Sequence, residues 1–188
     1  MALAPTYAAH RLLPAAAGAH TLEVFLDYTC PFSAKIWRRL TKDVIPYLAS
    51  AEPKVAVVFR HQVQPWHPAS TLLHEASLAV EKINPSAFSL YSTALFEHQH
   101  EFFDEATLAA SVNAVDDTLA VLQLLDIQAG EPKNGGNAVT NDLKYHIKLA
   151  RAQGIHVSPT VVFDGIRDDG VSSSWTLEQW KAWLAPRL

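Results

Sequence analysis

The sequence predicts an α/β fold with a helical insertion. Three observations predict this class: a strand–helix–strand pattern over residues 22–60, a mainly helical block over residues 71–127, and a return to strand character from residue 158. The 188 residues are 49% hydrophobic and 18% charged, which is ordinary for a globular chain with a sizeable core.

The first part of the chain is typical of a β-α-β unit. Residues 22–27, LEVFLD, alternate and contain β-formers, and residues 54–60, KVAVVFR, form the apolar run of a strand covered on both faces. Pro31 suits the first turn of a helix between them, where its missing N–H costs nothing. So short a crossover implies parallel strands. The helix, over about 31–49, is marked by apolar residues at four-residue steps: Phe32, Ile36, Leu40, Val44 and Leu48.

The middle of the chain is mainly helical. After a proline-punctuated loop at residues 61–70, apolar periodicity predicts a helix ending near Ile83 and another over about 86–98. The segment 130–137, GEPKNGGN, breaks this block. A third helix is marked by apolar residues three and four positions apart: Leu108, Val112, Val115, Leu119 and Leu122.

Strands return in the last third of the chain. A helix from about Val139 ends near Gly154, which suits the position after a helix C-terminus. Residues 158–165, SPTVVFDG, predict a strand and a turn, with a weaker strand near 169–173. The start of a last helix, at Leu177, carries two signals: a Thr176–Gln179 capping box and a Trp175–Trp180 hydrophobic staple.

Cys30 is the only cysteine, and it falls between the first strand and the first helix. At a helix N-terminus, unpaired backbone N–H groups and the helix dipole favour thiolate, which lowers a cysteine pKa from about 8.5 into a range of roughly 3.5–7.5. This edge of an open α/β sheet is also where ligands and reactive groups lie. A reactive thiol and a small buried hydrophobe both stay open on position alone.

Pro159 begins the late strand, with Ser158 before it and Thr160 after it. A proline cannot donate a hydrogen bond to a strand ladder, and a strand-initiating proline is a common place for a cis peptide bond. The alternative is an ordinary trans proline at the edge of a sheet.

Together these features resemble the DsbA-like type of the thioredoxin fold. The resemblance spans about residues 20–185 and rests on two motifs in the right order: a C-P-x-[CS] motif, here CPFS at 30–33, and a late G-[IV]-x-x-[STV]-P-T motif, here GIHVSPT at 154–160. It implies three parts: an N-terminal extension at 1–20, a thioredoxin-like domain at 21–66 and 137–188, and an inserted helical subdomain at 67–136.

By that resemblance, Cys30 is the nucleophile and Ser33 stands where a resolving cysteine is usual. Pro159 is then the cis-proline that lies against the thiol, and Ser158 offers backbone groups to an extended substrate. The implied substrate-binding set is completed by the neighbouring residues Pro31, Phe32 and Thr160.

Ser33 is a departure with chemical consequences. A C-x-x-S site cannot store a disulfide, because a mixed disulfide on Cys30 has no internal thiol to resolve it. Monothiol chemistry stays open: Cys30 attacks a protein or glutathione mixed disulfide, Ser33 hydrogen-bonds to the sulfur, and an external thiol releases the adduct. We therefore expect a monothiol oxidoreductase acting on peptide or protein thiols and disulfides, with glutathione as co-substrate and no bound cofactor.

Two other functions stay open. Kappa-class glutathione transferases and 2-hydroxychromene-2-carboxylate isomerases have a similar layout, and by that resemblance Ser33 or Thr29 donates to the sulfur of bound glutathione. The other alternative is a non-catalytic, peptide-binding module, in which Ser33 is only a good residue for a first helical turn.

The nine histidines do not show metal-ligand spacing, and we expect them to be exposed loop residues without a metal. The net charge of −4 gives no reason to expect nucleic acid or an anionic membrane as partner, and no apolar run approaches the roughly 20 residues of a membrane span. A single cysteine suits a reducing, cytoplasmic location. The last residues, Pro186, Arg187 and Leu188, only loosely resemble a peroxisomal signal.

Overall fold

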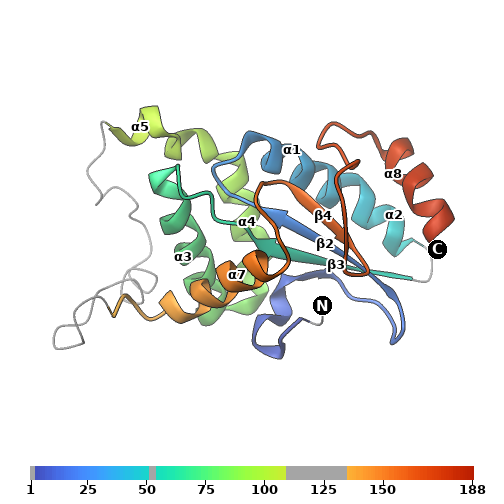
Figure 1. Ribbon diagram of the computed structural model, residues 1–188, viewed down its shortest axis with the longest axis horizontal. Helices are drawn as coiled ribbons and strands as arrows, with labels where there is room; N and C mark the ends of the chain where they lie inside the picture. The colour runs from blue at the N-terminus through green and yellow to red at the C-terminus, as the bar shows by residue number, and fades with distance from the viewer. Residues whose placement is uncertain (1–2, 51–53, 109–134) are drawn as a thin grey trace.

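The computed structural model describes residues 3–50, 54–108 and 135–188. Figure 1 shows these residues as a twisted sheet with helices on both faces. In the described residues the sheet has five strands in the order β1-β3-β2-β4-β5. β2 and β3 are parallel, which confirms the predicted crossover, and the other pairs are antiparallel. The strands are β1 (Arg11–Leu13), β2 (His20–Leu26), β3 (Val55–His61), β4 (Thr160–Phe163) and β5 (Ile166–Asp168).

The predicted helix over 31–49 forms, with a change of winding in its middle. It consists of α1 (Pro31–Arg39), a π-helical turn η2 (Leu40–Val44) and α2 (Ile45–Ala49). Pro46 has no N–H to continue the usual ladder, and just before it the N–H of Ile45 reaches back five residues to the carbonyl of Leu40. The chain therefore passes the proline without ending the helix.

The described part of the inserted block is mainly helical. The predicted helices ending near Ile83 and over 86–98 are observed, whereas most of the helix expected around Leu108–Leu122, and most of the break at 130–137, lie outside the described residues. No helix in the described ranges is both long and apolar enough to cross a bilayer. The elements of the block are α3 (Pro68–Ile83), η3 (Pro85–Ala87), α4 (Phe88–Glu97), η4 (Gln99–Phe102) and α5 (Asp104–Leu108). The helix α7 (Thr140–Ala152) follows the insertion.

Alternating side chains of β2 pack into separate apolar clusters on the two faces of the sheet. Leu22, Val24 and Leu26 join Trp37 of α1 and Trp180 of α8 (Leu177–Leu184) in one large core cluster. Phe25 points the other way and packs with three residues on the α7 side: Ala150, Ile155 and Val162. Both faces of the central strand are thus covered.

The last strand lies three residues earlier than expected. Asp164 and Gly165 have positive φ values of 48° and 83°, and Phe163 pairs with Ile166 directly across this two-residue turn. Such a turn matches the twist of the flanking strands, so β5 begins at once, at 166 and not near 169. The predicted capping box on α8 is confirmed, because Thr176 accepts from the Gln179 N–H and the Gln179 side chain accepts from the Thr176 N–H. A short turn, η6 (Ala185–Arg187), follows α8.

The N-terminal segment is built into the fold, which differs from the extension expected at residues 1–20. β1 pairs with β3 at the edge of the sheet, after the short helix η1 (Pro5–His10). Tyr7 and His10 of η1 are buried, and the Tyr7 hydroxyl donates to Asp142 of α7 at 2.9 Å. The alanine-rich composition of this segment did not indicate that Tyr7 and His10 would be buried.

Candidate active site around Cys30

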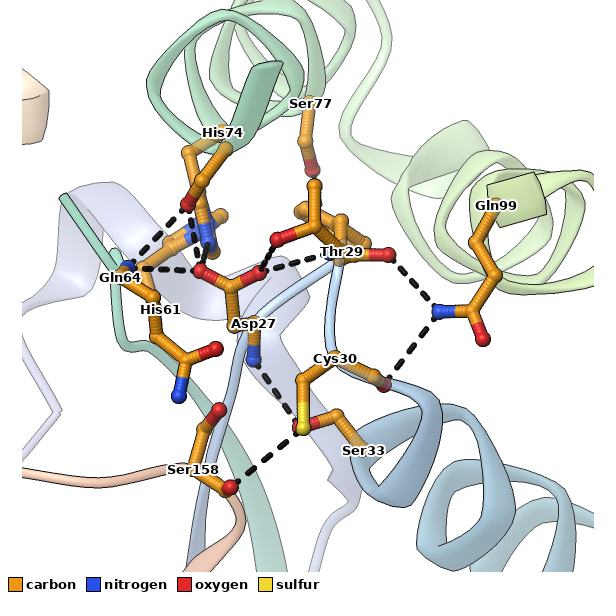
Figure 2. Close-up of polar contacts among 12 residues, drawn as sticks. Asp27, Thr29, Cys30, Ser33, His61, Gln64, His74, Ser77, Gln99 and Ser158 are labelled. Atoms are coloured by element: carbon orange, nitrogen blue, oxygen red, sulfur yellow. Dashed lines mark hydrogen bonds and ion pairs between the residues drawn. The ribbon is translucent and has the colours of Figure 1, made fainter. Parts of the chain in front are cut away.

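Cys30 is the N-cap residue of α1, between β2 and that helix. Its carbonyl accepts the first helical hydrogen bond, from Ala34 N–H at 3.1 Å, and the residue is only 5% exposed. Its Sγ lies 3.4 Å from the carbonyl oxygen of Ser158 and donates to it (Figure 2). The structure therefore brings together the two motifs that stand 128 residues apart in the sequence.

The Asp27 carboxylate shapes the turn that presents the thiol. Its Oδ1 accepts from the Thr29 N–H at 2.6 Å and from the Thr29 hydroxyl at 2.5 Å, which forms an Asx turn. The Cys30 N–H in turn donates to the Asp27 carbonyl at 3.2 Å. Residues 27–30 are thus held in one conformation, which aims Cys30 at the start of α1.

The second oxygen of Asp27 ties this turn to the inserted helices. Oδ2 accepts from the Gln64 N–H at 2.8 Å and from the Ser70 hydroxyl, and lies 3.5 Å from Nε2 of His74 (Figure 2). Asp27 is fully buried, and burial alone would raise its pKa. The bonds from His74, Ser70 and Thr29 outweigh this effect and lower the pKa to about 2, so the carboxylate is ionised at neutral pH.

Ser33 supports the same turn. Its hydroxyl is completely buried and accepts from the Asp27 N–H at 3.2 Å. Among the described residues, no hydrogen bond joins Ser33 to the Cys30 sulfur, although one was expected. Gln99, from the inserted block, donates to the carbonyls of Tyr28 and Cys30 at 3.0 and 3.3 Å. The backbone around the thiol is therefore fixed from both sides.

The Ser158–Pro159 peptide bond is cis. Ser158 and Pro159 are half-buried, while Thr160 is buried and its hydroxyl donates to the Val157 carbonyl at 2.7 Å. The Ser158 hydroxyl is buried and has no hydrogen-bond partner among the described residues. The turn from Val157 to Thr160 thus lies beside the thiol and contains one polar group, the Ser158 hydroxyl, that is left without a hydrogen bond within the described ranges.

Exposed apolar side chains flank the site. Phe32, next to Pro31 in the exposed first turn of α1, is 62% exposed, and Val157, next to Ser158, is 58% exposed. Trp66, in the loop after β3, is 57% exposed and lines a pocket of about 300 Å³ together with residues of α7 and Ile155.

Sequence reasoning missed several residues of this site, among them Asp27 and Gln99. Asp27 carries a usable signal, because an Asp two positions before a Thr favours an Asx turn. Gln99 carries none, since its partners lie about 70 residues away in the chain. The expectation of exposed loop histidines was wrong for four of them, which are buried in regular elements: His10 of η1, His61 of β3, His74 of α3 and His146 of α7 (Thr140–Ala152).

The fold and the site define the class of protein. A parallel β2–β3 pair, an antiparallel β4–β5 hairpin, and a cysteine that caps the first helix beside a cis-proline turn make a thioredoxin fold of the thiol–disulfide oxidoreductase type. Residues 13–185 match the protein family described as thioredoxin. The chain therefore belongs to the thioredoxin family.

Solved structures agree with this assignment. A candidate protein-disulfide isomerase from Pseudomonas syringae is 29% identical, with a TM-score of 0.73 over 95% of this chain and 99% of that one. The fold is shared with the thiol-disulfide exchange protein α-DsbA2 of Wolbachia pipientis (17% identity, TM-score 0.61, 93% and 85% covered). It is also shared with the thiol-disulfide oxidoreductase MdbA of Corynebacterium diphtheriae (18%, 0.59, 90% and 86%). No curated protein matches the sequence.

The Asp27→Asn variant tests the role of the buried carboxylate. We expect it to lower the free energy of unfolding by at least about 2 kcal/mol at pH 7, because an amide cannot accept all the bonds that the carboxylate accepts. The folded pKa of about 2 lies below the ordinary 3.8, so the charged state contributes stability above pH 4 that is lost as the pH falls toward 2. About half of this contribution should be gone by pH 3.

Urea unfolding at several pH values measures this difference. The matched control is Asp43→Asn, since Asp43 is a partly exposed residue paired with Arg39 within one helix. It should change the free energy of unfolding by less than about 1 kcal/mol. Equal stabilities of the two variants at pH 7 would contradict the role given to Asp27.

Proposed function

We propose that this protein is a monothiol thiol–disulfide oxidoreductase in which Cys30 is the only nucleophile. The observation that carries the proposal is the contact of Cys30 Sγ, at the N-terminus of α1, with the Ser158 carbonyl beside the cis-proline. A helix N-terminus stabilises a thiolate, and the chain offers no second cysteine. A reducing compartment such as the cytoplasm suits a lone working thiol.

The reaction proceeds by two exchanges. The Cys30 thiolate attacks one sulfur of a substrate disulfide, a new S–S bond forms, and the other sulfur leaves as thiolate and takes up a proton. The thiolate of an external thiol then attacks the mixed disulfide, which regenerates the Cys30 thiolate and forms a second, external disulfide. For a glutathionylated protein and glutathione, the net products are the free protein thiol and glutathione disulfide.

Ser33 makes the external thiol necessary. Position 33 is completely buried and one helical turn from Cys30, but an alcohol cannot displace the sulfur of a mixed disulfide. Glutathione is the co-substrate we propose. The pocket of about 300 Å³ supports it, because Arg151 and His156 line this space and could hold carboxylates. The pocket also reaches Ile155, three residues before Ser158.

Protein or peptide disulfides are the proposed primary substrates. Because Cys30 is only 5% exposed, a substrate disulfide has to seat closely against the surface around it. That surface presents the apolar side chains of Phe32, Trp66 and Val157. Extended peptides could add backbone contacts at Ser158 and apolar contacts at these three side chains.

The structure gives less support to a glutathione transferase. That function needs a hydroxyl group that donates a hydrogen bond to the sulfur of bound glutathione. The Thr29 hydroxyl already donates to Asp27 at 2.5 Å. Ser33 is the remaining donor, and it lies buried behind Cys30 in the first turn of α1.

Incubation with glutathione disulfide tests the nucleophile. We expect one glutathione adduct per chain, which excess glutathione removes, because Cys30 is the only thiol that can exchange. Intact mass spectrometry measures both steps, and Cys30→Ser is the control that should form no adduct. The contrary result is a folded wild-type chain that forms no adduct although Cys30 is fully alkylated after unfolding. It would favour the non-catalytic binding module.

The Ser33→Cys variant tests whether the site geometry supports redox chemistry. A thiol at position 33 should form a reversible disulfide with Cys30, since both residues belong to the first turn of α1. The oxidised variant should then oxidise a reduced model peptide, which the wild type does not do. Non-reducing alkylation and peptide mass measure these events. A variant that folds, as judged by circular dichroism, yet forms no internal disulfide would argue against a redox site.

The Phe32→Ser variant tests the substrate surface. We expect the exchange rate with a glutathionylated protein to fall about ten-fold. An aromatic side chain that becomes buried when the substrate binds contributes about 1–2 kcal/mol to binding. Exchange with small glutathione disulfide should change little. The matched control is Leu90→Ser, since Leu90 is 76% exposed on α4 and belongs to no part of this site. Equal effects of both variants would refute the assignment of this surface.

A further inference from the structure

Four buried histidines meet behind the candidate active site. His10 comes from η1, His61 ends β3, His74 lies on α3 and His146 lies on α7, and none is more than 1% exposed. His10, His61 and His146 each offer one ring nitrogen, and these three atoms lie within 4.8 Å of one another. The site thus joins the N-terminal segment, the sheet and the helix after the insertion.

Several ring nitrogens in this cluster lack hydrogen-bond partners among the described residues. Both nitrogens of His146 and Nε2 of His61 are buried, and the described residues offer them no hydrogen bond. His10 has one polar contact, a distance of 3.0 Å between its Nε2 and the Glu81 carboxylate. Buried polar atoms without partners are rare in folded proteins, and each costs about 1–3 kcal/mol, so several together indicate an absent ligand.

We propose that His10, His61 and His146 form a buried binding site for Zn²⁺, with Glu81 as the outer partner of His10. Three imidazole nitrogens are a common zinc donor set, and nitrogen donors select zinc over calcium or magnesium. A zinc ion with bonds of about 2.0–2.1 Å needs its ligand nitrogens roughly 3.4 Å apart. The three rings therefore move toward one another by about 1 Å when the ion binds.

The surroundings of the cluster match those of a zinc site. A ligating histidine usually gives its other nitrogen to a carboxylate or another polar group, which fixes the ring. The Glu81 carboxyl group lies 3.0 Å from Nε2 of His10, and Nδ1 of His61 lies 2.6 Å from Nδ1 of His74, which leaves Nε2 of His61 for the ion. His74 in turn stands 3.5 Å from Asp27 (Figure 2).

The protonation states agree with the geometry. Burial lowers the pKa of His10 to about 3 and that of His146 to about 2, and it holds the pKa of His61 well below its usual range. All three rings are therefore neutral at pH 7, which is the form that binds metal. The nearby Arg60 is paired with Glu23 at 2.5 Å. Burial raises the pKa of Glu81 to about 8, and a cation bound beside it would favour the ionised carboxylate.

The site is independent of the redox proposal. Its three ligands anchor η1 to β3 and α7, so we expect the ion to stabilise the fold and take no part in disulfide exchange. Zinc on the Cys30 thiolate is the competing outcome. Binding that survives Cys30→Ser therefore separates the two.

The experiment uses the full chain freed of any affinity tag. After unfolding in a chelator and refolding, the chain is titrated with Zn²⁺ and, separately, with Co²⁺. We expect one ion per chain, a rise in melting temperature, and a visible Co²⁺ spectrum of nitrogen ligation that lacks a thiolate charge-transfer band. His146→Gln should weaken Zn²⁺ binding by more than about 100-fold, because it removes a direct ligand. The matched control is His98→Gln, because His98 is an exposed histidine on the inserted block. This variant should bind Zn²⁺ as tightly as the wild type does.

Three results would overturn the proposal. They are less than stoichiometric Zn²⁺ with no change in melting temperature, a thiolate band that disappears in Cys30→Ser, and equal Zn²⁺ affinity of the wild type and a folded His146→Gln. Should His146→Gln fail to fold, the Co²⁺ spectrum and stoichiometry of the wild type and of Cys30→Ser decide the outcome by themselves.

Discussion

A single buried carboxylate organises the region around the thiol. Asp27 accepts hydrogen bonds from Thr29 in its own turn, from Gln64 after β3 and from Ser70 at the start of α3. A buried charge is costly unless it is fully hydrogen-bonded, so the three segments are bound to one arrangement. The position of Cys30, the start of α1 and the docking of the inserted helices all depend on this residue.

Ser33 gains a structural meaning from the same arrangement. Its hydroxyl accepts from the Asp27 N–H inside the core, where an unpaired donor would be costly. A thiol is a weaker acceptor than a hydroxyl, so serine suits this position better for the turn. The residue that prevents internal resolution of a mixed disulfide is thus the one that completes the support of Cys30.

Local signals in the sequence predicted local structure well. The Thr176–Gln179 capping box, the glycine at 154 and the parallel pairing of β2 with β3 follow from patterns within a few dozen residues. β5 was misplaced although the Asp164–Gly165 pair is a recognisable turn signal. Cys30 and Pro159 stood out by their positions in the sequence, and a family resemblance implied their roles. The buried histidines and Gln99 could not be found, because only the folded chain brings their partners from distant segments together.

The order in which the chain is synthesised gives the long-range contacts a further consequence. β2, Cys30 and α1 leave the ribosome well before Ser158, whose carbonyl covers the thiol 128 residues later. Likewise, Tyr7 is synthesised 135 residues before its hydrogen-bond partner Asp142. The nascent chain therefore carries an uncovered thiol and an undocked N-terminus until α7 and β4 emerge. Cys30 is therefore open to small thiols and disulfides in the unfinished chain, before the fold limits what can reach it.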